Sequence, residues 1–94
     1  MKTPEAREKD EICKYLDSIG AWYFKPFMGP YGKRGVPDII ACIAGTFWGI
    51  EVKREGKELT PLQRKCLNDI HIQGVRVTWG TADKVIETLR VNVG

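Results

Sequence analysis

Two short apolar segments, separated by a two-residue turn, constrain the fold of this chain more than any other feature. Residues 38–43 read DIIACI and residues 46–53 read TFWGIEVK, with Ala44 and Gly45 between them. Runs of β-branched and aromatic residues that flank a two-residue turn are typical of a β-hairpin. We therefore predict an antiparallel pair of strands here.

The predicted hairpin collects charged residues at its open end. Counting outward from the turn, the register pairs Asp38 with Glu51, and alternation along the strand puts Lys53 on the same face as Glu51. The same register pairs Ile43 with Thr46 and Ile40 with Gly49. Ala44 is the weakest point of this prediction, because type I′ turns favour Asn, Asp or Gly, and a longer loop would shift the register.

Two carboxylates that face each other across a hairpin repel unless a cation or hydrogen bonds compensate their charges. A divalent metal ion is the simplest compensation, since Mg²⁺ and Mn²⁺ prefer hard oxygen ligands such as Asp38 and Glu51. Lys53 could then approach a scissile phosphate or an attacking water and stabilise the developing charge. An ordinary salt bridge between Lys53 and one carboxylate is the alternative interpretation.

The composition fits one globular domain over residues 1–94 and disfavours several kinds of chemistry. The chain has 94 residues, of which 43% are hydrophobic. The three cysteines lack CxxC spacing and lie in apolar patterns, so we expect reduced core thiols and no zinc site. With His71 as the single histidine, a histidine-based nuclease or a serine–histidine hydrolase is hard to assemble. The chemistry must therefore use carboxylates and lysine.

The sequence predicts a cytoplasmic protein with no membrane partner. No run of eighteen or more apolar residues is present, and the first residues, MKTPEAREKDE, are too charged for a signal peptide. Residues 25–65 hold eight basic and four acidic side chains, a net charge of +4, whereas the rest of the chain carries −1. A cationic middle fits a phosphate-bearing partner, and solvated surface charge is the other interpretation.

The remaining segments complete a mixed sheet flanked by helices. Helices are predicted at about 4–19, at about 61–73 and after Thr81, with strands at 21–28 and 75–79. A flexible basic loop is expected over residues 29–37. The aromatic residues near the first strand are expected in the core or an interface rather than as base-stacking platforms: Trp22, Tyr23, Phe24 and Phe27. The order α-β-β-β-α-β-α indicates the α/β class with a mixed sheet.

These features, in this order and context, resemble a known nuclease superfamily. Pro37-Asp38, a gap of twelve residues and Glu51-Val52-Lys53 are similar to the PD-(D/E)xK pattern. More closely, the chain resembles the VRR-NUC (virus-type replication-repair nuclease) family over nearly its whole length. The matching stretches are TPE, FKPFMGPYGKRGVPDII, GIEVKREGKELTPLQRKCL and GVRVTWG.

The resemblance implies a restriction-endonuclease-like core and a role for each matching residue. Asp38, Glu51 and the main-chain carbonyl of Val52 would bind Mg²⁺ or Mn²⁺, and Lys53 would orient or activate the water. A glutamate on the first helix is also implied. Glu5 and Glu8 both point towards the buried side of that helix, and the spacing to Gly20 favours Glu5. A plain first-turn acid that complements the helix dipole is the alternative for Glu5.

The resemblance also implies a glutamine early in the second predicted helix. Gln63 would bind the water or a phosphate, but it equally fits the third position of a Thr-x-x-Gln capping box. Phosphate contacts are expected from Lys33 and Arg34 in the basic loop, with solubility as their alternative role. Further basic candidates for DNA binding are Arg54, Lys57, Arg64 and Lys65.

Together these expectations describe a metal-dependent endonuclease that cleaves branched DNA such as a four-way junction, in a bacterial or phage-infected cell. A two-fold junction calls for a homodimer, because one small active site cuts one strand. One alternative is a non-catalytic DNA-binding or assembly module with the same fold, which the intact Asp38, Glu51 and Lys53 disfavour. A restriction-type, sequence-specific nuclease is disfavoured because no target-recognition insertion is evident.

Overall fold

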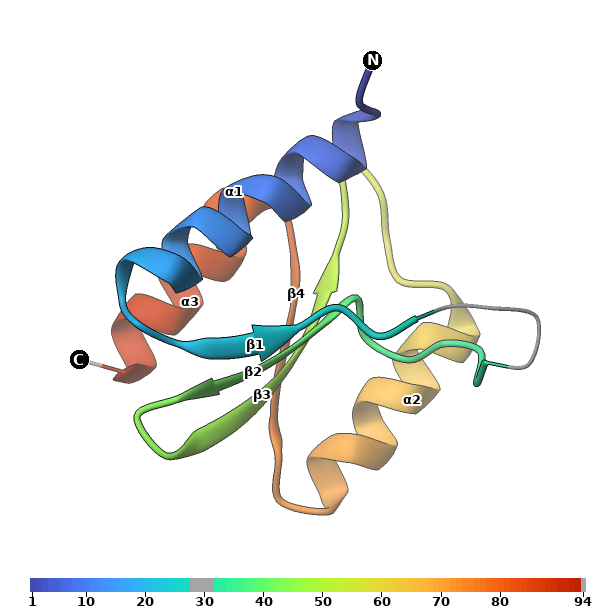
Figure 1. Ribbon diagram of the computed structural model, residues 1–94. Coiled ribbons are helices and arrows are strands. Elements are labelled where there is room, and N and C mark those ends of the chain that lie inside the picture. The colour runs from blue at the N-terminus through green and yellow to red at the C-terminus, as the bar shows by residue number, and fades with distance from the viewer. Residues whose placement is uncertain (28–31, 94) are drawn as a thin grey trace.

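A computed structural model describes residues 1–27 and 32–93 of the chain. The last residue of the predicted first strand (28), residues 29–31 of the predicted basic loop and Gly94 lie outside the described residues. The order of elements agrees with the expected α-β-β-β-α-β-α (Figure 1). The elements are α1 (Pro4–Ser18), β1 (Trp22–Phe24), β2 (Ile39–Ile43), β3 (Thr46–Val52), α2 (Pro61–Ile72), β4 (Arg76–Gly80) and α3 (Ala82–Val93).

One mixed four-stranded sheet organises the molecule, with the strands in the order β1-β2-β3-β4. The first three strands are antiparallel neighbours, and β4 runs parallel to β3 because α2 forms the crossover between them. Helices α1 and α3 lie side by side on one face of the sheet, and α2 lies on the opposite face against β3 and β4 (Figure 1). No helix in the described residues is long and apolar enough to span a bilayer.

The hairpin register is confirmed by the pairs Ile43–Thr46 and Ile40–Gly49. Ala44 has φ of 49° and Gly45 has φ of 85°, the two positive values that a type I′ turn requires. Ala44 is the one non-glycine residue with a positive φ among those described. The turn therefore forms at the expected position, with alanine held in a conformation that side chains disfavour.

The main core lies between the sheet and the pair α1 and α3. Alternate residues of β2 and β3 enter it, and Ile39 and Ile50 face each other across the hairpin with no exposed surface. The helices close this core with Ile12 and Leu16 of α1 and with Val85 and Leu89 of α3. Cys13, Cys42 and Cys66 are free thiols as expected, but each is half-buried rather than fully inside this core.

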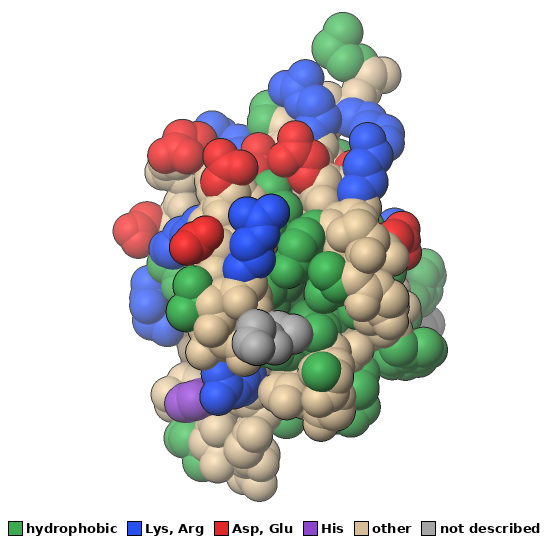
Figure 2. All heavy atoms as spheres, turned by 90° about the vertical axis from the view of Figure 1, so that its left-hand side faces the viewer, with side chains coloured by type: hydrophobic (Ala, Val, Ile, Leu, Met, Phe, Trp, Pro, Cys, Tyr) green, Lys and Arg blue, Asp and Glu red, His purple; other side chains and the backbone are tan. Residues whose placement is uncertain are grey.

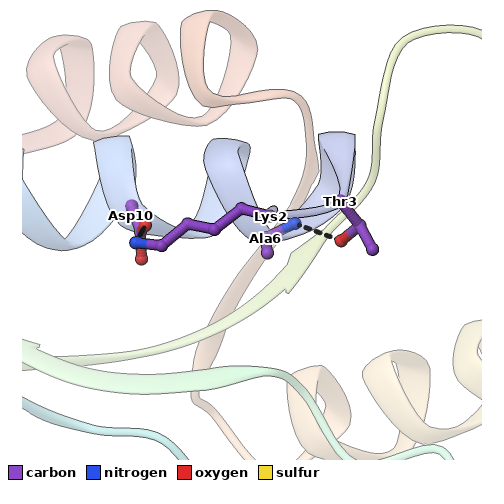
Figure 3. Close-up of polar contacts among 4 residues, drawn as sticks. All are labelled: Lys2, Thr3, Ala6 and Asp10. Carbon is purple, nitrogen blue, oxygen red and sulfur yellow. Dashed lines mark hydrogen bonds and ion pairs between the residues drawn. The ribbon is translucent and has the colours of Figure 1, made fainter.

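The helices begin where capping residues predict. Thr3 caps α1 by accepting a hydrogen bond from the N–H of Ala6 at 3.1 Å (Figure 3). The side chain of Lys2 lies along the helix and pairs with Asp10. The α1 helix ends at Ser18, and the chain turns at Gly20 with φ of 71°. The cap sets where α1 begins, and the burial of Ile12 and Leu16 sets which side of the helix faces the sheet.

The first strand differs from the sequence prediction. It covers only Trp22–Phe24 rather than 21–28, because Pro26 lacks the N–H that a longer ladder needs. Its aromatic residues are not core: Trp22 is 60% exposed, Phe24 46% and Phe27 89%. Tyr23 alone turns towards α1, where its hydroxyl donates to Asp17 at 3.0 Å. The other three therefore lie outside the core, because α2 covers only the β3–β4 half of this face, and their place in an interface stays a prediction.

Candidate active site

Asp38 stands at the start of β2, next to the end of β3, as the register predicts. Its Oδ2 accepts a hydrogen bond from the backbone N–H of Val52 at 2.8 Å. The preceding Pro37 is buried against Gly49, where a side chain would come within 3.2 Å of the proline ring. The bare glycine thus leaves room for Pro37, and Pro37 fixes the direction from which Asp38 approaches the strand.

Glu51 is the most unusual side chain of the site. It is only 3% exposed, and its Oε1 is buried without a hydrogen-bond partner among the described residues. Burial raises the pKa of Glu51 to about 8, with further contributions from the charge of Asp38 and a hydrogen bond shared with it. The two carboxyl groups are therefore close neighbours, and a cation at this position would relieve the cost of holding them together.

The backbone of Val52 offers a third oxygen. In a strand the N–H and C=O of one residue point to the same side, so the carbonyl of Val52 points towards the side where its N–H meets Asp38. The next N–H, that of Lys53, donates to the carbonyl of Gly80 in the neighbouring strand at 2.8 Å. Parallel pairing of β3 with β4 thus holds this stretch of backbone in place.

Lys53 lies at the end of β3 and is 9% exposed. Its positive charge opposes the other influences on Glu51 and lowers the pKa of that carboxyl group. Within the described residues, Lys53 forms no ion pair with Asp38 or Glu51. The simple salt bridge considered as the alternative is absent from this part of the chain, and the ammonium group remains available for another partner.

A lysine that sequence reasoning missed does contact the site. Lys9 of α1 places its Nζ 3.6 Å from Oδ1 of Asp38, and both side chains are partly buried. The two residues are 29 positions apart, and no motif marks Lys9. Only the packing of α1 on the sheet brings them together.

The structure separates the two candidate glutamates of α1. Oε1 of Glu8 accepts a hydrogen bond from the N–H of Ala82 at 2.7 Å, so Glu8 caps the first turn of α3. The charge of Glu5 makes a smaller contribution to the raised pKa of Glu51, after burial and the nearby Asp38. Glu8 has a structural role in this arrangement, and Glu5 is the candidate for the site.

The donor set fits a hard divalent cation. Asp38 and Glu51 supply carboxylate oxygens, one of them unpaired, and the Val52 carbonyl lies on the same side. Across the described residues, no three side chains of His, Cys, Asp or Glu gather closely enough to form a ligand cluster by themselves. Two carboxylates, one carbonyl and water or phosphate oxygens are the usual environment of Mg²⁺.

Gln63 sits in the predicted capping box. Its Oε1 accepts from the N–H of Thr60 at 3.0 Å, while its own N–H donates to the Thr60 hydroxyl at 3.2 Å. The box accounts for the side-chain oxygen of Gln63 and leaves its amide nitrogen for other contacts. Capping is thus confirmed, whereas a role in the reaction stays a prediction.

All but one of the predicted basic residues line two clefts. Lys33, Arg34 and Lys65 line a cleft of about 440 Å³ beside α2, where Lys65 also pairs with Asp69 at 2.7 Å. The other cleft, of about 240 Å³, opens beside the end of β3 and is lined by residues 53–58, which follow β3, and by the end of β4 and the start of α3. Its basic lining residues are Lys53, Arg54, Lys57 and Lys84. Arg64 is exposed on α2 and lines neither.

Lys84 was not predicted, because nothing in the sequence connects the last helix to the E-x-K strand. Its Nζ lies 4.1 Å from the centre of the Trp79 ring, which positions the ammonium group beside the cleft. Acidic side chains gather elsewhere, towards the upper part of the face shown in Figure 2. Exposed acids of α1 and α3 include Glu11, Asp17, Asp83 and Glu87.

Comparison with known proteins supports the fold. The chain is similar to a solved structure described as "VRR_NUC domain", with a TM-score of 0.82 and 22% sequence identity. The similarity covers 99% of this chain and 100% of that chain. No family model matches the sequence. No curated protein matches it either. The fold is therefore VRR_NUC-like, which confirms the architecture that the sequence resemblance implied.

Proposed function

We propose that this chain is a metal-dependent nuclease that hydrolyses phosphodiester bonds in DNA. The observation that carries the proposal is the buried, unpaired Oε1 of Glu51 beside the carboxyl group of Asp38. Such a pair is costly for the fold in the absence of a cation, whereas apolar residues of similar size would pack there without that cost. A costly, charged arrangement in a VRR_NUC-like fold is the signature of a functional site.

The protein groups have distinct roles in this proposal. Asp38, Glu51 and the carbonyl of Val52 hold Mg²⁺ or Mn²⁺, which supplies Lewis-acid chemistry when bound. Lys53 stabilises negative charge on the scissile phosphate or orients the attacking water. Glu5 orients that water from the side of α1, and the free amide nitrogen of Gln63 contacts water or phosphate.

DNA is the proposed substrate because cations line the clefts near the site. Arg54 and Lys57 share a cleft with Lys53, so a backbone that enters there passes the reacting groups. Lys33 and Arg34 would contact a second stretch of backbone, with Arg64 and Lys65 on the adjoining helix. Contacts of this kind position DNA without reading its sequence, so we propose recognition of a branched structure such as a four-way junction.

Paired cuts in such a junction need two active sites, and one face of the sheet suits a second copy of the chain. The register places Trp22 beside Cys42 and Cys42 beside Phe47, so these side chains share one row across three strands. Phe24 lies on the same face in the next row. The three aromatic side chains are 46–60% exposed. They leave an apolar surface on the order of 300 Å².

A second copy fits this surface better than nucleic acid does. Lys25 is the only cation on β1 or directly beside it among the described residues, whereas a stacking surface for DNA needs a positively charged track. β1 is also an edge strand, which favours contact with another protein chain. A standard half-interface is about 800 Å², so the aromatic patch would form its apolar centre. We propose a two-fold homodimer through this face.

The decisive experiment combines substrates, metals and matched variants. The parent chain should cut a four-way junction in Mg²⁺ or Mn²⁺ and not in EDTA, and duplex, flap and single-stranded DNA should be tested beside it. Asp38→Asn, Glu51→Gln and Lys53→Ala should each lower the single-turnover rate by about 10³-fold or more while DNA binding and the folded spectrum persist. Asp83→Asn, which changes an exposed acid of α3, serves as the matched control.

One result would contradict the role of Lys53, and another would contradict the nuclease proposal as a whole. Metal-dependent cleavage by Lys53→Ala within a few-fold of the parent rate would remove Lys53 from the reaction. Tight junction binding by the parent without cleavage in any metal would favour the non-catalytic DNA-binding module instead.

A further inference from the structure

Helix α1 carries a basic residue, as well as acidic ones, near the end of the β2–β3 hairpin. Glu5, Glu8 and Lys9 are spaced so that all three lie on one side of the helix. Glu8 caps α3, and Lys9 meets Asp38. Among the described residues, Lys9 is the one basic side chain that forms an ion pair with a proposed metal ligand.

The two oxygens of Asp38 are in different situations. Oδ2 is held by the N–H of Val52 at 2.8 Å, while Oδ1 faces the ammonium group of Lys9 at 3.6 Å. The hydrogen bond to the backbone fixes the carboxylate and occupies one acceptor position of Oδ2, so Oδ1 is the oxygen with more room for a metal ion. Lys9 therefore lies against the atom that a metal would use. Its side chain is 31% exposed, which leaves it room to withdraw towards solvent.

A divalent ion and an ammonium group on the same oxygen would repel at this separation. We propose that Lys9 is a positioning residue that acts as an exchangeable counter-ion: it neutralises and holds Asp38 in the metal-free protein, and an arriving Mg²⁺ or Mn²⁺ displaces it. This inference rests on the metal site of the proposed function. Lys9 keeps the ligand in place before loading, and the competition makes metal binding weaker than the carboxylates alone would give.

Metal binding, measured without DNA, tests this role. Lys9→Met keeps the apolar stem and removes the charge, and Mn²⁺ binding followed by calorimetry or electron paramagnetic resonance should become about 3- to 10-fold tighter. Lys14→Met changes the same residue type on the exposed side of α1 and should leave the Mn²⁺ affinity within about 1.5-fold of the parent value. Lys9→Arg retains the cation and should remain close to the parent.

The outcomes separate this inference from the proposed function. Unchanged or weaker Mn²⁺ binding by Lys9→Met, with the parent binding normally, overturns the counter-ion role and leaves the nuclease proposal intact. If Lys9→Met does not fold, Lys9→Gln gives the same test with a polar side chain. A parent chain that binds no Mn²⁺ overturns the metal site and the role of Lys9 together. A parent that binds Mn²⁺ but cuts no DNA overturns only the nuclease.

Discussion

The two faces of the β2–β3 hairpin are built from alternate residues of the same strands, yet they differ in polarity and in exposure to solvent. The face towards α1 and α3 is mostly apolar and buried, with Ile39 and Ile50 at its centre. The opposite face carries a charged pair, a bare glycine and exposed aromatic residues. One strand pair thus supports the fold on one side and presents chemistry on the other.

This difference explains how a domain of 94 residues can hold a costly site. Small domains are marginally stable, so the cost of a buried carboxyl group with one unpaired oxygen must be offset elsewhere. The regular core on the opposite side provides that offset, and the period of two keeps the two sets of residues apart. If the two faces are functionally separate, changes on one should leave the property of the other intact.

The largest effect on stability is expected in the core. Ile39→Ala should lower the free energy of unfolding by about 2–5 kcal/mol, because it creates a cavity at a fully buried position. Ile40→Ala changes the next residue of the same strand, which faces the site side and is half-buried, and should cost less than about 1.5 kcal/mol. Urea unfolding of dilute protein in EDTA compares them. Equal costs would mean that the site face is as closely packed as the core.

The first helix repeats this division and offers a second test. Glu5→Gln should slow single-turnover cleavage about 10- to 100-fold, because it removes a charged group from the site. Glu8→Gln should leave the rate within about 2-fold and cost about 0.3–1 kcal/mol of stability, since the charge at the first turn of α3 is lost. A slow Glu8→Gln variant beside a fast Glu5→Gln variant would reverse the assignment made from the cap at Ala82.

The aromatic part of the site face should be tested by self-association. Trp22→Glu combined with Phe47→Glu should raise the dimer dissociation constant at least about 10-fold, because charge would be buried at the centre of the interface. Ile72→Glu, at an isolated exposed position of α2, is the matched control and should remain dimeric. Sedimentation velocity measures both. A monomeric parent that loses DNA binding on the same two changes would instead identify this face as a DNA contact.

The last prediction concerns how the stability of the folded chain depends on pH. The pKa of Glu51 is raised to about 8 in the folded chain, against about 4.3 when unfolded, so the folded state binds this proton more tightly. Its contribution to stability is therefore complete below about pH 4 and is lost as pH rises to about 8. In EDTA, Glu51→Gln should gain at least about 1 kcal/mol over the parent between pH 5 and pH 8.5. Thermal melts across this range measure the difference, and parallel curves would contradict it.

Local patterns were sufficient for much of the fold. The alternation in 38–53 and the two-residue turn fixed the hairpin register, and with it the meeting of Asp38 and Glu51. Capping residues marked the starts of α1 and α2 correctly. These features depend on neighbours in the sequence, where propensity and periodicity act directly.

Contacts between distant elements could not be predicted in the same way. The pairing of Lys9 with Asp38 and of Glu8 with Ala82 depends on how α1 crosses the sheet, and no periodicity encodes that. The exposure of Trp22 had a similar origin. Its hydrophobicity indicated burial, but coverage depends on which half of the sheet α2 occupies. Tertiary placement, rather than local preference, decided these three cases.

The two-residue turn at Ala44 and Gly45 sets the strand register on which the candidate site depends. With this turn, the twelve residues between Asp38 and Glu51 place both carboxylates on one face of the hairpin. One inserted residue that shifted the pairing of β3 would turn Glu51 into the core and bring an isoleucine to the site. Changes in chain length that preserve this site should therefore come in pairs within the hairpin, or be absorbed at the turn itself. Outside the hairpin, as in the loop before Asp38, insertions of one residue do not change which face Asp38 and Glu51 share.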